Sequence, residues 1–422
     1  MVRQMEQTSE SLRERCHINT NIEDDTFVGI VCDQKGARVN FPLGFDTSDE
    51  DDNELRSDIL ILMQAIARTT ANRESEINNL NTDYFSNAAP IAAYLNVIRD
   101  FYARGYYHET EVQYSQGKSG KISWGRTIKN IRPVIQDNEV YYLDFIIRRS
   151  SINYNELITQ IHKYCVYQSM KNLGWLFTSY IPPEPQIRFN KKLFESVVSE
   201  KLSSTFNDRN RILFRSMLAI IDWDSDENKT ALMYGTNRFE YVWESLIDQV
   251  YGIDEKKEYF PKTRWVIRGK EYDSSSLEPD SIMLYNGNVY ILDAKYYRFG
   301  WTTHAGDLPA SSSINKQITY GEYAEGMKKN KGKKIYNAFI MPFNSLQKEW
   351  INETRGDTIL NIGKAVSDWK KGDKEYENIQ GILVDTKHLM RIVTRRDTSE
   401  IIRLAEAIEK GFSDAGMVNV NV

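Results

Sequence analysis

Two aspartates and a lysine form the most informative pattern in the sequence. Asp280 follows a proline, and Asp293 and Lys295 lie further along in an Asp-Ala-Lys segment. Apolar runs on both sides of an Asn286-Gly287 pair predict two strands joined by a two-residue turn. Side chains alternate between the two faces of a strand, so Asp293 and Lys295 are expected on one face. The same register places Asp280 opposite Asp293.

This arrangement predicts a metal site. Two neighbouring carboxylates repel each other unless a cation lies between them. Mg²⁺ prefers oxygen ligands and is usually held by one or two carboxylates together with a phosphate. A metal held by Asp280 and Asp293 would supply hydroxide for phosphodiester hydrolysis, and Lys295 would orient the attacking water and stabilise the developing negative charge. The alternative is a solvated strand end with a surface ion pair.

A helix expected over Asn237–Tyr251 offers a third carboxylate. Its apolar residues fall on one stripe, namely Phe239, Val242, Trp243, Leu246, Ile247 and Val250. Glu240 and Glu244 lie one turn apart beside this stripe, and either can reach a metal held by the aspartates. Glu240 is closer to the border of the stripe, so helical geometry slightly favours it. Two solvated glutamates are the alternative.

A second helix, expected over Ile314–Lys329, carries two accessory candidates. Gln317 and Tyr320 are three residues apart and share a face, where they would position a DNA strand or the lysine. An ordinary helix surface is the alternative. Basic runs at 328–334 and 387–396 are suited to phosphate contacts, with solvated loops as the alternative.

Composition limits the class of protein. The chain has 422 residues, 41% of them hydrophobic and 27% charged, which is typical of a globular protein with two or three domains. The net charge of −5 does not favour nucleic-acid binding over the whole surface, although a metal nuclease needs acidic residues at its centre. The three cysteines lack the spacing of a zinc site or a disulfide framework. Without a signal-peptide pattern or a long apolar stretch, the expected location is the cytoplasm, with no membrane contact.

The order of the predicted elements and the positions of prolines predict the domain organisation. Prolines at 182, 183 and 185 make the clearest break. We therefore expect an α/β protein with a mixed α+β region over 1–185 and a nuclease domain over 186–422. The first region is expected to contact a partner or DNA, and it includes strand–turn–strand patterns within 26–41 and 112–123. Alternating helices and strands in the second predict a central mixed sheet flanked by helices.

The residues of the predicted site also resemble a known family. The segment 277–300 (LEPDSIMLYNGNVYILDAKYYRFG) resembles the PD-(D/E)xK nuclease core, and more narrowly the LlaJI-type restriction endonucleases and the related McrC subunits. Segments 27–45 and 120–129 are similar to N-terminal parts of these proteins. The resemblance implies a Mg²⁺-dependent DNA endonuclease in which Mn²⁺ can substitute. It also implies Asp280, Asp293 and the backbone of Ala294 as metal ligands, with Lys295 catalytic.

The resemblance bears on the helix carboxylate as well. The segment FEYVWE at 239–244 resembles the tryptophan-glutamate helix that precedes the core in the LlaJI group, which implies Glu244. In McrC-like sequences the corresponding glutamate can follow a phenylalanine, which would point back to Glu240. Both residues therefore remain open at this point.

A partner is implied by the same resemblance. McrC-like nucleases work with a McrB-type AAA+ GTPase, and this chain has no nucleotide-binding loop motif of its own. The basic segment 114–126, with Lys118, Lys121 and Arg126, would then contact the motor ring. A double-strand cut usually needs two nuclease sites, so a homodimer on DNA is expected. The alternatives are a stand-alone site-specific type II restriction endonuclease, or an adaptor that activates an AAA+ ring with little cleavage of its own.

Overall fold

The computed structural model describes residues 11–20, 26–33, 36–47, 51–74, 90–136, 139–152, 156–178, 180–225, 232–393 and 397–413. The chain forms two compact units, one of residues 1–88 with 231–422 and the other of residues 89–230. The second unit is therefore inserted into the sequence of the first. This division differs from the expected single boundary near residue 185, because the prolines there connect two helices of the second unit. Helices and several sheets make the chain a mixed α/β protein, as predicted.

A four-stranded sheet joins the two sequence segments of the first unit. Its strand order is β1-β3-β2-β9, with the bounds β1 (Cys16–Ile18), β2 (Val28–Asp33), β3 (Gly36–Phe41) and β9 (Leu232–Thr236). The antiparallel β2–β3 pair confirms the predicted strand pair. Gly29 on β2 lies opposite Gly235 on β9, and a Cβ atom on either would lie 2.2 Å from a backbone oxygen of the other strand. Only glycine permits this close approach.

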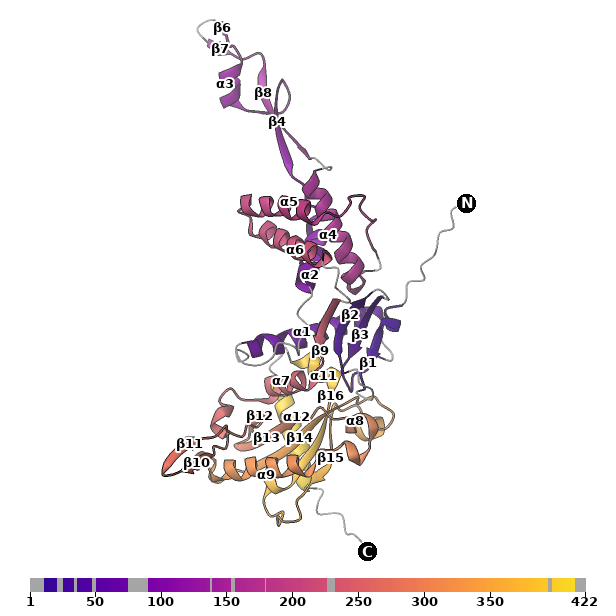
Figure 1. Ribbon diagram of the computed structural model, residues 1–422, viewed down its shortest axis with the longest axis vertical. Coiled ribbons are helices and arrows are strands. Elements are labelled where there is room, and N and C mark those ends of the chain that lie inside the picture. Colours follow the sequence, from indigo (N-terminus) through magenta and orange to yellow (C-terminus); the bar gives the residue numbers. More distant parts are fainter. Residues whose placement is uncertain are drawn as a thin grey trace, which may run out of the picture. The chain divides into compact units, whose positions relative to one another are not determined.

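A five-stranded mixed sheet forms the centre of the same unit. Its order is β12-β13-β14-β16-β15, with the bounds β12 (Ser281–Tyr285), β13 (Asn288–Ala294), β14 (Ile335–Phe343), β15 (Ile359–Ala365) and β16 (Ile379–Asp385). The three inner strands are parallel and the two edge strands antiparallel. Asn286 and Gly287 both have positive φ, so the predicted Asn-Gly hairpin turn is confirmed. A separate hairpin of β10 (Arg264–Ile267) and β11 (Lys270–Asp273) precedes this sheet (Figure 1).

Helices pack against the central sheet. They are α7 (Phe239–Tyr251), α8 (Phe299–Thr302), α9 (Ser311–Gly326), α10 (Ile351–Thr354), α11 (Thr386–Ile392) and α12 (Thr398–Ser413). Helix α1 (Asp52–Glu74) packs on α7, α11 and β9. Helix α9 connects the parallel strands β13 and β14, and its Ile318 and Ala324 pack with Ile282 and Ile291 of the hairpin. The predicted apolar stripe of α7 is buried, and α7 contacts β12 and β13.

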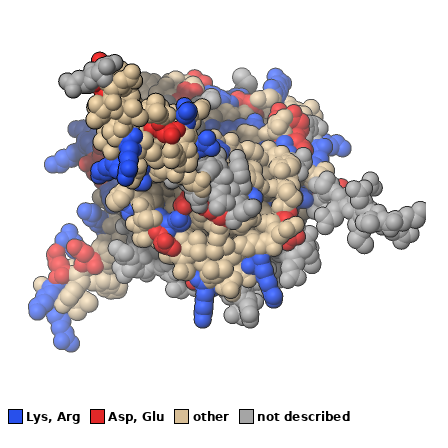
Figure 2. Space-filling view, turned by 90° about the horizontal axis from the view of Figure 1, so that it is seen from above, with Lys and Arg blue, Asp and Glu red and all other residues tan. Residues whose placement is uncertain are grey.

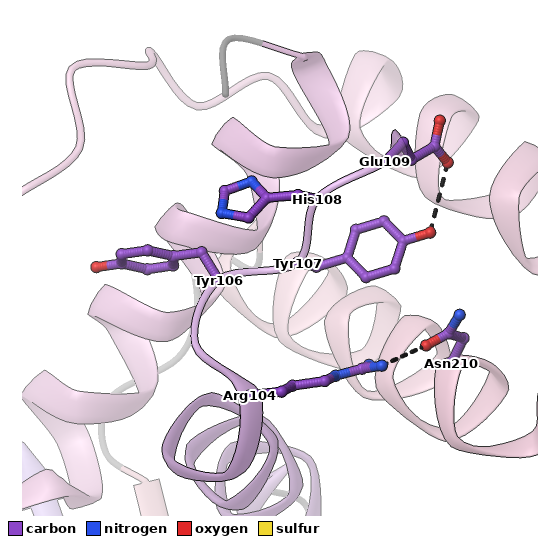
Figure 3. A pocket seen from close by; sticks show the side chains of 6 residues that line it. All are labelled: Arg104, Tyr106, Tyr107, His108, Glu109 and Asn210. Carbon is purple, nitrogen blue, oxygen red and sulfur yellow. Dashed lines mark hydrogen bonds between the residues drawn. The ribbon is translucent and has the colours of Figure 1, made fainter. Parts of the chain in front are cut away.

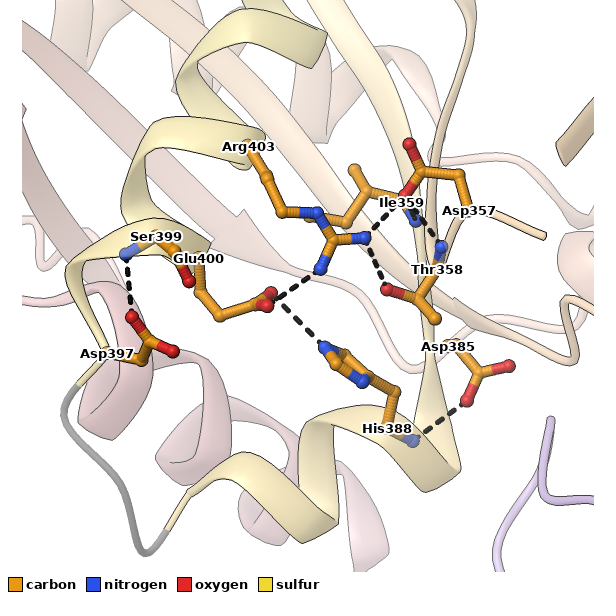
Figure 4. Close-up of polar contacts among 9 residues, drawn as sticks. All are labelled: Asp357, Thr358, Ile359, Asp385, His388, Asp397, Ser399, Glu400 and Arg403. Atoms are coloured by element: carbon orange, nitrogen blue, oxygen red, sulfur yellow. Dashed lines mark hydrogen bonds and ion pairs between the residues drawn. The ribbon is translucent and has the colours of Figure 1, made fainter. Parts of the chain in front are cut away.

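A polar cluster holds the C-terminal helices to the sheet (Figure 4). Arg403 on α12 contacts Asp357 at 2.5 Å and Glu400 at 2.7 Å. The Glu400 carboxylate also lies 3.2 Å from His388 Nε2 on α11. Burial alone would raise the pKa of Glu400, but His388 and Arg403 hold it below its ordinary value. These contacts fix α11 and α12 at the start of β15.

The second unit is a group of helices with a strand-built extension. The helices are α2 (Ile91–Arg104), α3 (Trp124–Asn130), α4 (Leu157–Leu173), α5 (Lys191–Ser204) and α6 (Asp208–Asp224). The strands are β4 (Thr110–Gly117), β5 (Lys121–Ile122), β6 (Val134–Gln136), β7 (Glu139–Tyr141) and β8 (Phe145–Ile152). The strands predicted within 112–123 are present as β4 and β5, but each of them pairs with β8 and not with the other.

A cavity of about 550 Å³ lies in this second unit (Figure 3). Arg104 on its wall contacts Asp100 at 2.7 Å and Asn210 at 2.8 Å. Glu109, also on the wall, pairs with Lys201 at 2.7 Å. Arg104 thus joins α2 to α6, and Glu109 joins the segment before β4 to α5.

Candidate active site

The β12–β13 hairpin brings the two predicted aspartates together. Ser281 pairs with Leu292, so the next position along the ladder sets Asp280 opposite Asp293. Asp280 Oδ2 accepts a hydrogen bond of 2.8 Å from the backbone N–H of Ala294. This bond fixes the Asp280 carboxyl group at the end of β13, directly beside Asp293.

Lys295 completes the group at the same strand end. Its Nζ atom lies 2.5 Å from Asp293 Oδ2, and its backbone N–H donates to the carbonyl of Ile340 on β14 at 2.8 Å. Burial alone would lower the pKa of Lys295, but the charges of Asp293 and Asp280 outweigh burial and raise that pKa. The lysine is therefore a cation at neutral pH.

The backbone that carries Asp280 is held from two further elements. Lys256, in the 3₁₀ helix Lys256–Tyr259, donates from Nζ to the carbonyl oxygen of Asp280 and to the Asp248 carboxylate, each at 2.7 Å. Tyr320 on α9 donates its hydroxyl hydrogen to the carbonyl of Glu278 at 3.0 Å. The sequence singled out Tyr320 but gave no signal for Lys256, whose partner is a distant backbone atom.

Helix α7 places Glu244 at the site. The fully buried Trp243 donates from Nε1 to the Ile340 carbonyl at 3.1 Å, the same oxygen that accepts from the Lys295 backbone. The next residue, Glu244, acts on Asp280 through its charge and raises the pKa of that carboxyl. Glu240 instead pairs with Arg238 at 3.2 Å. Of the two glutamates left open by the sequence, the structure brings Glu244 near Asp280, and both residues line the same cavity.

The electrostatics of the site favour a bound cation. Burial, followed by the charges of Asp293 and Glu244, raises the pKa of Asp280 to about 8. A divalent cation relieves such repulsion, and the oxygen-only donor set is the type that Mg²⁺ prefers. As placed in the described parts of the chain, His, Cys, Asp and Glu side chains do not form a group of three or more that encloses a metal. The residues fit Mg²⁺ by donor chemistry and charge.

A cavity of about 350 Å³ opens beside Asp280. Its lining residues are Glu244, Ser245, Asp248, Gln249, Lys256, Lys257, Phe260, Glu278, Pro279 and Asp280. The cavity therefore adjoins two of the three site carboxylates and gives a ligand access to them.

The structure places Gln317 away from the expected position. The Gln317 side chain is 1% exposed, and its Nε2 donates to the Ile291 carbonyl on β13 at 2.8 Å. Gln317 therefore holds α9 against the sheet and does not face a region that a DNA strand can reach. The fully buried Tyr320 acts from the same helix on the backbone before Asp280.

Some of the basic side chains in each predicted basic run form ion pairs. Lys387 and Arg391 contact the two oxygens of the buried Asp58 at 3.1 and 2.8 Å, and residues 394–396 lie outside the described residues. Lys329 pairs with Glu258, and Lys334 pairs with Glu375. Figure 2 shows basic and acidic side chains interspersed over the face it presents. No continuous basic surface is visible on that face.

The three residues expected to contact a motor lie in the second unit, on and around β5 and α3. Lys118 and Lys121 are exposed. Arg126 is also exposed, but its guanidinium group lies 3.9 Å from the centre of the Tyr114 ring. Arg126 therefore has a packing role that the two lysines lack.

The fold and the site define a mixed α/β protein with a carboxylate–lysine centre at the end of a hairpin. The family model described as LlaJI restriction endonuclease matches residues 27–354. The chain belongs to this family, which confirms the resemblance to the LlaJI-type restriction endonucleases. The matched residues include Glu244, Asp280, Asp293 and Lys295.

A curated relative supports the same assignment. It is the "Type II restriction enzyme BsuMI component YdjA" of Bacillus subtilis (strain 168), 27% identical over 264 residues. The alignment covers 56% of this chain and 55% of the relative, so the chain spans about half the length of that protein. Among the described residues, helices long and apolar enough to cross a membrane are absent.

Proposed function

We propose that this chain is the Mg²⁺-dependent endonuclease subunit of a restriction system. The observation that carries the proposal is the meeting of Asp280, Asp293 and Lys295 at one end of the β12–β13 hairpin, with Glu244 on the wall of the cavity that opens beside Asp280. The order of elements agrees with a PD-(D/E)xK core: an antiparallel strand pair bearing the acids, a crossover helix, and a parallel strand. Membership in a restriction endonuclease family supports DNA as the substrate.

Each residue has a role in this proposal. Asp280, Asp293 and the backbone carbonyl of Ala294 would hold Mg²⁺, for which Mn²⁺ can substitute, and Glu244 would assist. The bound metal would supply hydroxide and stabilise negative charge on the scissile phosphate. Lys295 is positioned by Asp293 to orient the attacking water and to stabilise the same charge.

A second protein is part of the proposal. The relative from Bacillus subtilis is described as a component of its restriction enzyme, which supports a partner subunit here. The similarity to McrC subunits favours a McrB-like AAA+ GTPase as that partner. Lys118 and Lys121 are exposed and available for this contact. A homodimer on DNA would supply the two sites that a double-strand cut requires.

Plasmid cleavage by the purified chain tests the proposal. The wild type is compared with Asp293→Ala in Mg²⁺, with and without GTP and the proposed AAA+ partner. Asp368→Ala, an exposed aspartate away from the site, is the matched control. We expect Asp293→Ala to lose at least about 100-fold in rate and Asp368→Ala to cut like the wild type.

The outcomes separate three functions. Cleavage that needs both Asp293 and the motor supports the proposal in full. Cleavage that needs Asp293 but no nucleotide favours a stand-alone type II restriction endonuclease. If DNA is never cut while the motor's GTP hydrolysis is stimulated, the nuclease proposal fails and the chain is an adaptor.

A further inference from the structure

The β10–β11 hairpin exposes an unusual set of side chains. Trp265 and Tyr272 lie directly opposite each other in the antiparallel ladder and are 67% and 52% exposed. Ile267, on the same face as Trp265, is 51% exposed. Every residue of the two strands is exposed. Packing within the unit therefore does not explain why Trp265, Ile267 and Tyr272 are apolar or aromatic.

The base of this hairpin belongs to the wall of the proposed active site. Two more backbone bonds continue the ladder inward, from Ser274 to Thr263 at 2.9 Å and from Leu277 to Pro261 at 3.0 Å. The residues next to that base, Phe260 and Glu278, line the cavity beside Asp280. Both strands of the hairpin are thus connected directly to residues that line the cavity beside Asp280.

The length of the hairpin suits a macromolecular ligand. At about 3.3 Å per residue, the strand from Pro261 to the turn reaches roughly 20 Å. The turn itself is narrow, since Arg268 and Gly269 both have positive φ. In Figure 1 the hairpin extends outward past β12.

The charge of the hairpin contrasts with that of the chain. Residues 262–273 include four basic residues, Lys262, Arg264, Arg268 and Lys270, and only two acidic ones, Glu271 and Asp273. Arg264 pairs with Glu271 at 2.6 Å. The whole chain carries a net charge of −5, so this segment is a locally basic element beside an acidic site.

We propose that the 262–273 hairpin binds in a groove of duplex DNA next to the scissile phosphate. This inference rests on the proposed nuclease function and names the surface that holds its substrate. The major groove of B-DNA admits a two-stranded β-ribbon. Arg268 and Lys270 contact phosphates at the tip, while Trp265 and Tyr272 contact bases and sugars. Because the base of the hairpin adjoins Asp280, the bound groove flanks the cut.

DNA binding, measured without cleavage, tests this inference. Fluorescence anisotropy with a labelled duplex at low salt is recorded in the Asp293→Ala background with Ca²⁺. We expect Arg268→Ala with Lys270→Ala to weaken binding about tenfold and to reduce the slope of log affinity against log salt by about two. Trp265→Ala with Tyr272→Ala weakens binding without changing that slope. The controls are Trp369→Ala, at a site 60% exposed, and Lys371→Ala.

The readout distinguishes this inference from the nuclease proposal. Loss of binding in the hairpin variants supports the inference even if the wild type never cuts DNA. Unchanged binding in these variants, or no duplex binding by the parent Asp293→Ala chain, overturns it. The inference is also overturned if the hairpin variants change their oligomeric state in solution but keep their affinity for DNA, because the hairpin would then be a self-association surface. Thermal unfolding is measured for each variant, and the single changes Arg268→Gln and Lys270→Gln repeat the test if a double variant is unstable.

Discussion

The Asp280 carboxyl group ionises at a much higher pH than an ordinary aspartate. Its pKa is raised to about 8, first by burial and then by Asp293 and Glu244. The unfolded chain releases this proton near pH 4, whereas the folded chain keeps it until about pH 8. Without metal, the free energy of unfolding therefore falls as pH rises from about 4 to 8 through this group.

This fall in the free energy of unfolding with rising pH leads to the first prediction. Asp280→Asn replaces the carboxyl group with a neutral amide of similar shape, so the cost of ionisation disappears. In EDTA at pH 8.5 we expect this variant to exceed the wild type in free energy of unfolding by at least about 1 kcal/mol. The difference should vanish near pH 3, where Asp280 is neutral in both the folded and the unfolded wild type. Urea denaturation at the two pH values measures it.

Metal addition provides the control for this prediction. Mg²⁺ should stabilise the wild type more at pH 8.5 than at pH 6, because the cation competes with the proton for Asp280. Asp280→Asn should gain little stability at either pH. Equal pH profiles for the two chains in EDTA would show that Asp280 is not the titrating group.

Lys256 gives the second prediction at this scale. Its two hydrogen bonds hold the Asp280 backbone and the Asp248 carboxylate. Lys256→Met removes both bonds, so we expect the Mg²⁺ concentration for half-maximal cleavage to rise about tenfold. The rate at saturating Mg²⁺ should change much less, since Lys256 acts by positioning a ligand. The measurement is cleavage rate against Mg²⁺ concentration.

The neighbouring lysine serves as the comparison for that experiment. Lys257 lines the same cavity. Lys257→Met should leave the Mg²⁺ dependence unchanged. If both substitutions shift the dependence equally, the effect comes from the charge of the cavity and not from the contact with Asp280.

At the residue scale, the sequence predicts those contacts whose residues are close together along the chain. The spacing of Asp280, Asp293 and Lys295 around a hairpin turn was sufficient to bring them together. The choice between Glu240 and Glu244 depends on how Trp243 anchors its helix to a distant strand. Such a tertiary contact leaves no mark in helical periodicity, so helix geometry alone slightly favoured the other glutamate.

At the scale of elements, strand pairs that are neighbours in the sequence are predictable, whereas pairs between distant strands are not. The β12–β13 hairpin was predictable because strand alternation and the Asn-Gly turn are neighbours in sequence. The pairing of β9 with β2 joins segments on either side of the inserted unit, and nothing in either strand specifies that partner. The pairing of both β4 and β5 with β8 was missed for the same reason.

The β2–β9 crossing supplies the element-scale prediction. A Cβ at Gly235 would lie 2.2 Å from the Val28 carbonyl oxygen and 2.5 Å from the Phe27 ring. Gly235→Ala must therefore separate the strands, and we expect it to lower the free energy of unfolding by about 2–4 kcal/mol. Urea denaturation tests this. Gly306→Ala, whose Cβ would meet open space, should cost much less. Similar losses for both would contradict the proposed steric origin.

At the scale of the whole molecule, the chain is one unit interrupted by another. Residues 89–230 form their own compact unit. Strand β2 precedes this inserted segment in the sequence and β9 follows it, and the two strands pair in one sheet of the first unit. Prolines at 182, 183 and 185 suggested a boundary because proline stops helices, but here they separate α4 from α5 within the inserted unit. The prolines therefore mark a connection between two helices, whereas the division into units depends on strand pairing between segments far apart in the sequence.

This organisation leads to the last prediction, which concerns the proposed motor. Lys118 and Lys121 are exposed in the inserted unit, whereas Arg126 also packs on the Tyr114 ring, so the two lysines can be changed without disturbing that stacking. We expect Lys118→Ala with Lys121→Ala to reduce stimulation of the AAA+ partner's GTP hydrolysis at least about tenfold, because two charge contacts are lost. Lys171→Ala with Lys192→Ala, two exposed lysines of the same unit, should stimulate like the wild type. GTP hydrolysis is measured against nuclease concentration. Equal stimulation by both double variants would exclude this lysine pair as the motor contact and would leave the partner to bind elsewhere.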